Sequence, residues 1–459
     1  MSRRQTKETD LGNDKIEGLL FRLALPAIMA QVINLLYNLV DRMYIGHIRD
    51  IGPAALTGVG VTMPVIMAVS AFAALVSMGG APRASIMMGK GDKEEAQRIL
   101  GNCAAMLVIT SLVLTLVIQL FGREILLLFG ASDNTVPYAW AYVRIYSLGT
   151  IFVQLALGLN AFINAQGYAQ TGMATVAIGA VCNIILDPIF IFGFHMGVQG
   201  AAVATILSQA VSCIWILHFL TGKKPTLQLQ LQYLKLKGST ILPCIGLGFA
   251  PFVMQFTESI LSICFNTSLL KYGSDIAVGA MTILSSVMQF SMLPIQGLTQ
   301  GAQPIIGFNY GAKKISRVKD CFKLTLFSCV LFTTIIWAIG MFAPQLFIGI
   351  FTADAQLMEF SKWAMRIYMA TSLVFGIQIA CQQTFIALGN AKTSAFLAML
   401  RKVILLIPLI YILPCIFTDK VMAVFLAEPV ADLIAVSTTV ILFYRQYRKL
   451  GQENKETKQ

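Results

Sequence analysis

Two acidic residues lie in stretches that are otherwise almost free of charge. Asp41 closes the segment LLYNLVD, and Asp187 lies four residues after Asn183 and directly before Pro188. The spacing of four puts Asn183 and Asp187 on one helix face, and a proline at 188 kinks a helix and frees a backbone carbonyl. Carboxyl groups held away from water favour the protonated form, more so when two lie close together. The pattern therefore predicts a site that binds and releases a proton.

Each of the two acids also has a structural alternative. Asp41 is followed by Arg42, so the two residues could form an ion pair at the membrane surface. Asp187 could be an acid whose only role is a hydrogen bond within a helix bundle. These alternatives stay open at the level of the sequence.

The second half of the chain contains three more acids within apolar stretches, namely Glu258, Glu428 and Asp432. If these stretches cross a membrane, charged residues within them are costly and mark functional sites by default. We therefore consider the three acids as a second coupling site or a substrate site. A position near a helix end, or a packing contact in the last span, is the alternative for Glu428 and Asp432.

Enzymatic chemistry has no support in the sequence. The three histidines lie far apart, and the nine cysteines are scattered without the spacing of a metal site. We expect no catalytic residue, no bound metal and no organic cofactor, and we predict that the protein is not an enzyme.

The composition requires an environment other than water. Charged residues make up 12% of the 459 residues, and hydrophobic residues make up 57%, whereas soluble chains are about 25% charged. The ranges 99–122, 324–353 and 367–391 contain no charge at all, and each is long enough to cross a bilayer as a helix. Strands of a membrane barrel are about half as long and alternate in polarity, so we predict an all-α integral membrane protein in contact with the lipid bilayer.

Twelve spans account for the apolar stretches: 19–45, 52–79, 98–121, 137–163, 170–194, 198–220, 240–270, 276–305, 321–347, 358–387, 395–417 and 421–444. Basic residues gather in the two tails and in the connections after spans 2, 6, 8 and 10, and Arg401 and Lys402, expected just inside the next helix, extend the last of these groups. By the positive-inside rule, both termini are cytoplasmic. The net charge of +12 is thereby explained without nucleic acid as a partner.

An internal repeat divides the chain. Two Arg-Ile-Tyr triplets begin at Arg144 and Arg366, and the interval between them, called the repeat interval below, also separates Gly167 from Gly389. Gly91 resembles Gly311, and Pro26 resembles Pro251, at nearly the same interval. The predicted organisation is a cytoplasmic tail (1–18), an N-lobe of helices 1–6 (19–222), a cytoplasmic linker (223–239), a C-lobe of helices 7–12 (240–445) and a second cytoplasmic tail (446–459).

Each half has six spans, so the halves form two pseudo-symmetric six-helix bundles in a parallel repeat. Transporters built on this plan bind substrate near the membrane midplane between the halves and work by alternating access. We expect Gln31, Gln255, Met288 and Gln289 to line that cavity, although packing is the alternative for any one methionine.

The chain resembles the multidrug and toxic compound extrusion (MATE) family, in particular its MepA-like bacterial branch. The similarity covers about residues 15–445 and is carried by the segment LLYNLVD with Gly46, by the repeated glycines, and by Asn183 with Asp187 and Pro188. The resemblance implies a twelve-helix, two-lobed exporter of amphipathic, often cationic compounds. It also implies a proton-coupling network of Asp41, Asn183, Asp187 and Thr205, and a bend of the first helix at Pro26.

The resemblance leaves the coupling ion open. Sodium-coupled members carry acids in spans 7 and 10; here span 7 has Glu258, but the charge-free part of span 10, from residue 367, has only glutamines, which favours H⁺ over Na⁺. We predict a monomeric, proton-coupled multidrug antiporter in the cytoplasmic membrane of a bacterium. The alternatives are a Na⁺-coupled drug antiporter and a flippase of lipid-linked or other amphiphilic metabolites.

Overall fold

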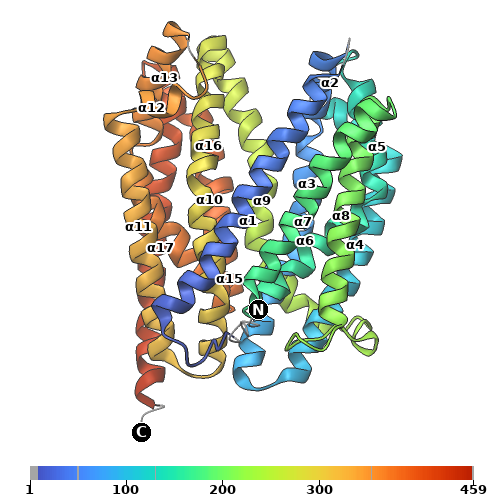
Figure 1. Ribbon diagram of the computed structural model, residues 1–459. Coiled ribbons are helices and arrows are strands. Elements are labelled where there is room, and N and C mark those ends of the chain that lie inside the picture. Colours follow the sequence, from blue (N-terminus) through green and yellow to red (C-terminus); the bar gives the residue numbers. More distant parts are fainter. Residues whose placement is uncertain (1–8, 49–50, 130, 353, 457–459) are drawn as a thin grey trace, which may run out of the picture.

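The computed structural model describes residues 9–48, 51–129, 131–352 and 354–456, and this part of the chain contains helices but no strand. The helices form two bundles that stand side by side (Figure 1). Both described ends of the chain lie at the same end of the molecule, which is called the termini side below. The predicted all-α, two-bundle class is confirmed.

The first bundle contains the helices up to α8: α1 (Ile16–Gly46), α2 (Gly52–Val61), α3 (Met63–Lys90), α4 (Lys93–Leu128), α5 (Val136–Leu148), α6 (Thr150–Ala165), α7 (Ala169–Pro188), the π-helix η1 (Ile189–Gly193) and α8 (Gly197–Thr221). A connection with one short 3₁₀ turn, η2 (Leu231–Tyr233), follows.

The second bundle contains the remaining helices: α9 (Gly238–Tyr272), α10 (Asp275–Gly311), α11 (Ile315–Phe342), α12 (Gln345–Ile348), α13 (Ala355–Tyr368), α14 (Ser372–Ala387), α15 (Ala391–Met399), the π-helix η3 (Leu400–Leu406), α16 (Ile407–Ile416) and α17 (Lys420–Glu456). The last helix continues well past the predicted end of span 12 at residue 444.

Ten helices in the described part of the chain are long and apolar enough to cross a membrane, and two bent pairs bring the number of spans to twelve. The pair α5–α6 is bent by 61° and the pair α13–α14 by 51°. Both bends lie in the fourth span of their bundle, so the bend itself is part of the repeat. The predicted spans coincide with these twelve elements to within several residues at most ends, although the second span extends further, to Lys90.

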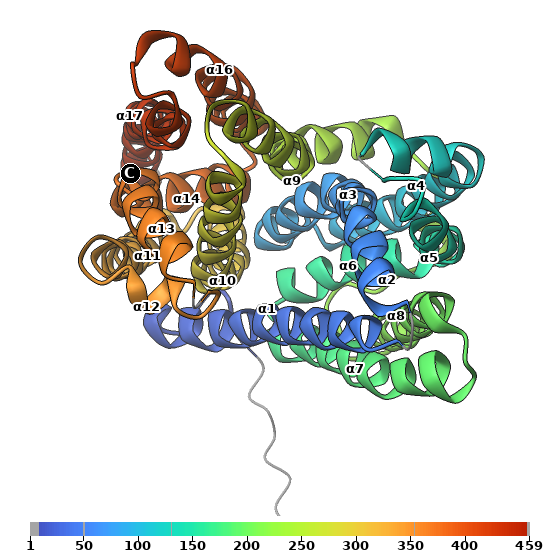
Figure 2. The same ribbon diagram turned by 90° about the horizontal axis from the view of Figure 1, so that it is seen from above.

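The bundles meet along a seam of helices that touch through glycines. A methyl group on Gly248 of α9 would lie 1.8 Å from the carbonyl oxygen of Leu75 in α3, and one on Gly311 of α10 would lie 2.0 Å from that of Ile86. Helix α1 also crosses the seam (Figures 1 and 2): it packs against α10 near its start and against α7 further along. These glycines lie in the half of the molecule nearer the termini, so the bundles are in contact on the termini side.

The glycine contacts correct one detail of the repeat. Gly89 of α3 contacts α10 in the same way that Gly311 of α10 contacts α3. A methyl group added to Gly89 would lie 1.9 Å from the carbonyl oxygen of Phe308. Gly89 and Gly311 are separated by the full repeat interval, so the match of Gly91 with Gly311 was wrong by two positions. Gly91 instead ends α3 in the left-handed conformation (φ 81°).

The segment before α1 closes over the seam on the termini side. Leu11 is buried beside Gly167 of the first bundle, and its carbonyl oxygen accepts a hydrogen bond from Asn309 of α10 (2.8 Å). Arg317 of α11 donates to the carbonyl oxygen of Asp14 (2.7 Å). The segment therefore contacts both bundles before the first helix begins.

Candidate functional site

The first candidate site lies between α1 and α7, where Asp41, Asn183 and Asp187 come together. Asn183 and Asp187 are buried on one face of α7, and the Asn183 amide donates to Oδ1 of Asp187 over 3.2 Å. Asp41 comes from α1 and is close enough for its carboxyl group to interact with that of Asp187. The predicted polar pair is therefore present, and a second acid from another helix faces it.

Three oxygen atoms of this site are buried without a hydrogen-bond donor from the protein: Oδ1 of Asp41, Oδ1 of Asn183 and Oδ2 of Asp187. A buried polar atom without a partner is costly, and most such atoms in proteins are paired. The acceptors of the site thus outnumber its donors. A proton on one carboxyl group would supply a donor and reduce the repulsion between the two acids.

Proline and a change of helix type shape the site. Pro188 follows Asp187 directly, and the helix continues as the π-helix η1 (Ile189–Gly193). Because Pro188 has no N–H group, the regular hydrogen-bond ladder is interrupted at this point. Short π-helical turns are frequent at functional sites.

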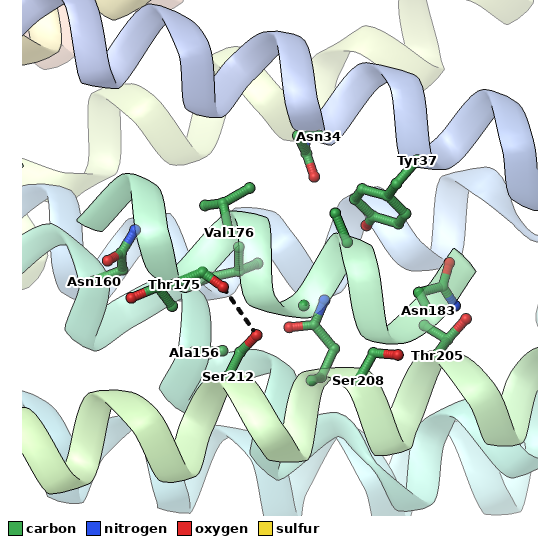
Figure 3. A pocket seen from close by; sticks show the side chains of 14 residues that line it. Asn34, Tyr37, Ala156, Asn160, Thr175, Val176, Asn183, Thr205, Ser208 and Ser212 are labelled. Atoms are coloured by element: carbon green, nitrogen blue, oxygen red, sulfur yellow. Dashed lines mark hydrogen bonds between the residues drawn. The ribbon is translucent and has the colours of Figure 1, made fainter. Parts of the chain in front are cut away.

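A cavity of about 50 Å³ adjoins Asn183 and has room for a few water molecules. Figure 3 shows Asn34 and Tyr37 of α1 on one side of it and Ser208 and Thr205 of α8 on the other. Thr205 lies in this wall but donates its hydroxyl to the carbonyl oxygen of Ala201 (3.0 Å). The predicted network member is thus near Asn183, without a direct bond to either acid.

The second candidate site is a cluster of five charged side chains in the second bundle. Arg401 lies in the π-helix η3 and binds two acids of α17: its Nε donates to Asp432 (2.6 Å) and its Nη2 to Glu428 (2.7 Å). All three side chains are at least nine-tenths buried. The ring of Phe375 lies against the guanidinium group, 4.4 Å away.

Lys402, the next residue, forms an ion pair with Glu258 of α9 and also donates to the carbonyl oxygen of Met254 (3.3 Å). Only 4% of the Lys402 side chain is exposed, whereas 52% of the Glu258 side chain is exposed. The cluster as a whole has three carboxylates and two cations.

This cluster corrects the topology argument. Arg401 and Lys402 were expected just inside the next helix, as an extension of the basic group after span 10, but both are buried well inside the span. The signal that would have found them is the repeat: positions 401 and 402 lie one repeat interval after Gly179 and Ala180, which are well inside α7. Glu258, Glu428 and Asp432 do come together, as proposed, but each is paired with a cation.

The residues predicted to line the substrate cavity lie on three helices. Gln31 of α1 donates to Gln300 of α10 across the seam (3.4 Å), and Gln289 of α10 is exposed. Gln255 is half-buried on α9, while Met288 packs against the core of the second bundle. Pro26 is buried inside α1, which is continuous as a helix from Ile16 to Gly46.

Among the residues whose side chains the structure describes, no group of three or more histidine, cysteine, aspartate or glutamate residues could hold a metal ion. The two candidate sites differ in whether their acidic groups are paired within the protein. The first has unpaired acceptor oxygens and an adjoining cavity, so it can take up a proton. The second is already neutralised in large part by its own cations.

Comparisons with known proteins agree with this architecture. The model of the MatE family matches residues 26–189 and 251–412, one segment in each bundle. The multidrug export protein MepA of Staphylococcus haemolyticus is 25% identical over 419 residues, which cover 91% of this chain and 92% of the relative. MepA of Staphylococcus aureus is 24% identical over 426 residues, with 92% and 93% covered.

Solved structures share the whole fold. A structure of the MATE multidrug transporter DinF-BH in complex with a small molecule is 35% identical, covers 96% of this chain and 98% of its own, and superposes with a TM-score of 0.87. A MATE structure described as being in the bent conformation has a TM-score of 0.89 at 21% identity and covers 98% of this chain and 100% of its own. The two matched segments together span more than half of the chain, and this protein therefore belongs to the MatE family of membrane transport proteins.

Proposed function

We propose that the protein exports amphipathic, often cationic compounds from a bacterial cell in exchange for protons. The compound class follows the names of its relatives, the multidrug export protein MepA and the multidrug transporter DinF-BH. The observation that carries the choice of the proton is the set of buried oxygens without donors at Asp41, Asn183 and Asp187. One bound proton gives this site the donor that it lacks.

The proton and the compound act through different affinities for two states of the transporter. A ligand shifts a conformational equilibrium only by binding one state better than the other. Protonation removes the repulsion between Asp41 and Asp187 and lets α1 and α7 pack closely. When water reaches the cavity beside Asn183, the proton is lost and separation of these helices is favoured. The different packing of α1 with and without the bound proton links the proton gradient to the movement of α1.

The orientation proposed for the protein places the termini side in the cytoplasm. The described segments before α1 and at the end of α17, and the connections after α3, α8 and α10, lie at this end and carry basic residues, as the positive-inside rule requires. Since the bundles touch on the termini side, the structure then corresponds to an outward-facing state. We propose that one chain, as a monomer, carries out the whole cycle.

The test is ethidium efflux from loaded cells or everted vesicles, driven separately by a pH gradient and by a Na⁺ gradient. Asp187→Asn and Asp41→Asn keep the size of the side chain but cannot release a proton, so each is expected to abolish efflux driven by the pH gradient. Asp133→Asn is the matched control, because Asp133 is an exposed acid of the first bundle outside the spans.

The outcome of this test distinguishes the proton-coupled exporter from a Na⁺-coupled antiporter and from a flippase. Efflux that survives both substitutions refutes the assignment of the proton site. Efflux that requires Na⁺ identifies a Na⁺-coupled antiporter instead, and absence of ethidium transport under either gradient, with transport of a lipid-linked sugar, identifies a flippase.

A further inference from the structure

The two bundles contain equivalent cavities. A cavity of about 50 Å³ lies in the first bundle and one of about 20 Å³ in the second. Six lining positions correspond through the repeat interval: Ala156 with Gln378, Leu157 with Ile379, Asn160 with Gln382, Val176 with Ala398, Gly179 with Arg401, and Ala180 with Lys402. The cavities thus occupy equivalent places in the two repeats.

The copies differ most at the last two pairs. In the first bundle, Gly179 and Ala180 carry almost no side chain, and both line the cavity. In the second bundle, the same positions carry two long cationic side chains, Arg401 and Lys402, both buried. The second cavity is the smaller of the two, and Arg401 and Lys402 lie in its wall.

Arg401 and Lys402 have different roles within the cavity. Arg401 neutralises Glu428 and Asp432, and these three side chains are buried together. Lys402 reaches the carboxylate of Glu258 and the carbonyl oxygen of Met254. A carboxylate and a carbonyl oxygen are the ligands that hard cations prefer, so the Lys402 ammonium group occupies a place that suits a monovalent cation.

Glu258 is accessible from the polar side of α9. A stripe of polar residues spaced three or four apart runs along this helix: Gln255, Glu258, Ser262 and Asn266. The stripe lies between two faces of α9. One meets α3, where the rings of Phe252 and Phe72 are in contact (centroids 5.1 Å apart), and the other carries Leu261 in the core of the second bundle. Because charge facing lipid is costly, this side of α9 faces the water-accessible interior between the bundles.

We propose that Lys402 is a tethered cation that occupies a monovalent-cation site at Glu258, excluding Na⁺ from the second bundle and competing with cationic compounds for the same carboxylate. The competition with organic cations rests on the proposed export function, whereas the exclusion of Na⁺ does not. The transporter then couples to a mobile ion in one bundle only.

The experiment compares the purified full-length protein with Lys402→Ala, in which the ammonium group is gone and the 20 Å³ cavity is enlarged. Thermal unfolding is measured in NaCl and in choline chloride at equal ionic strength, and ethidium binding by fluorescence polarisation. Lys402→Arg retains the cation, Glu258→Gln/Lys402→Ala removes the whole pair, and Lys392→Ala is the matched control, an exposed lysine at the start of the same span.

The native protein, Lys402→Arg and Lys392→Ala are expected to unfold at the same temperature in the two salts. Lys402→Ala is expected to unfold at a higher temperature in NaCl than in choline chloride, because binding to the folded state stabilises it. Its ethidium dissociation constant is expected to fall about tenfold, which corresponds to 1.4 kcal/mol. Both gains are expected to vanish in Glu258→Gln/Lys402→Ala. The comparison of the two salts is made within one variant, so a general loss of stability does not affect it.

The proposal is overturned if Lys402→Ala shows no difference between the salts, if the difference persists without Glu258, or if the native protein already responds to Na⁺. A Na⁺ response of Lys402→Ala in a protein that neither binds nor exports ethidium supports the tethered cation and contradicts the proposed function instead.

Discussion

A single methyl group on α9 is expected to open the seam between the bundles. In Gly248→Ala, the new Cβ would lie 1.8 Å from the carbonyl oxygen of Leu75 and 2.6 Å from its carbonyl carbon. Both atoms belong to the backbone of α3, so no side-chain rotation relieves the clash. To reach an ordinary contact of about 3.4 Å, the two helices must separate by about 1.6 Å at this crossing, because packed atoms resist overlap and cores tolerate little excess volume.

The free-energy cost applies to one conformation only. Overpacking costs about 1–3 kcal/mol, and this cost falls on the state in which the bundles touch on the termini side. A state in which they part on that side has room for the methyl group. Since 1.4 kcal/mol is a factor of ten in an equilibrium constant, the ratio of the two states is expected to shift about 5- to 150-fold toward opening on the termini side.

The shift is measured as a distance between spin labels by double electron–electron resonance. Lys93 at the start of α4 and Lys449 on α17 are exposed on the termini side of different bundles, and both are replaced by cysteine in a background without the native cysteines. Gly246→Ala is the control: it lies two positions away on the same helix, and an added methyl group there meets nothing within 4 Å. If Gly248→Ala gives the same distance distribution as Gly246→Ala, the seam does not hold the bundles together and the reasoning is refuted.

Two further predictions concern other parts of the structure. Arg401→Gln leaves the buried acids Glu428 and Asp432 without a cation, which is expected to lower the free energy of unfolding by about 3–5 kcal/mol. Thermal unfolding should show this loss of stability, and adding Glu428→Gln with Asp432→Asn should restore most of it. An unaltered unfolding midpoint in Arg401→Gln would contradict the buried cluster. Leu11→Asp places a charge at a buried position beside Gly167, so the same spin-label pair should report more opening on the termini side. An unchanged distance distribution would show that the segment before α1 does not hold the bundles together.

The spans were predictable because hydrocarbon leaves the backbone little choice. An apolar stretch of about twenty residues must pair its own N–H and C=O groups, and charge-free runs such as 99–122 identify α4 directly. The bends within α5–α6 and α13–α14 were not predictable, because they depend on packing against neighbouring helices. The joint packing of α1 against both bundles likewise depends on tertiary contacts that no local pattern specifies.

The two candidate sites were predictable to different degrees. Asn183 and Asp187 lie four residues apart on one helix, so their meeting follows from helix geometry alone, and only the arrival of Asp41 from α1 needed the fold. Arg401 and Lys402 were misplaced because a basic pair near the start of a span is usually interfacial. Both residues lie in the π-helix η3, which follows α15, and their side chains are buried there.

The contacts of the segment before α1 also fix an order of events during synthesis. Leu11 leaves the ribosome before any helix, yet it belongs to the same buried cluster as Leu388 of the α14–α15 turn and Leu450 near the end of α17. Proteins are made from the N-terminus onward, at several residues per second. Leu11 therefore cannot make its full set of contacts until the last helix has been inserted, and its complete burial marks the end of assembly.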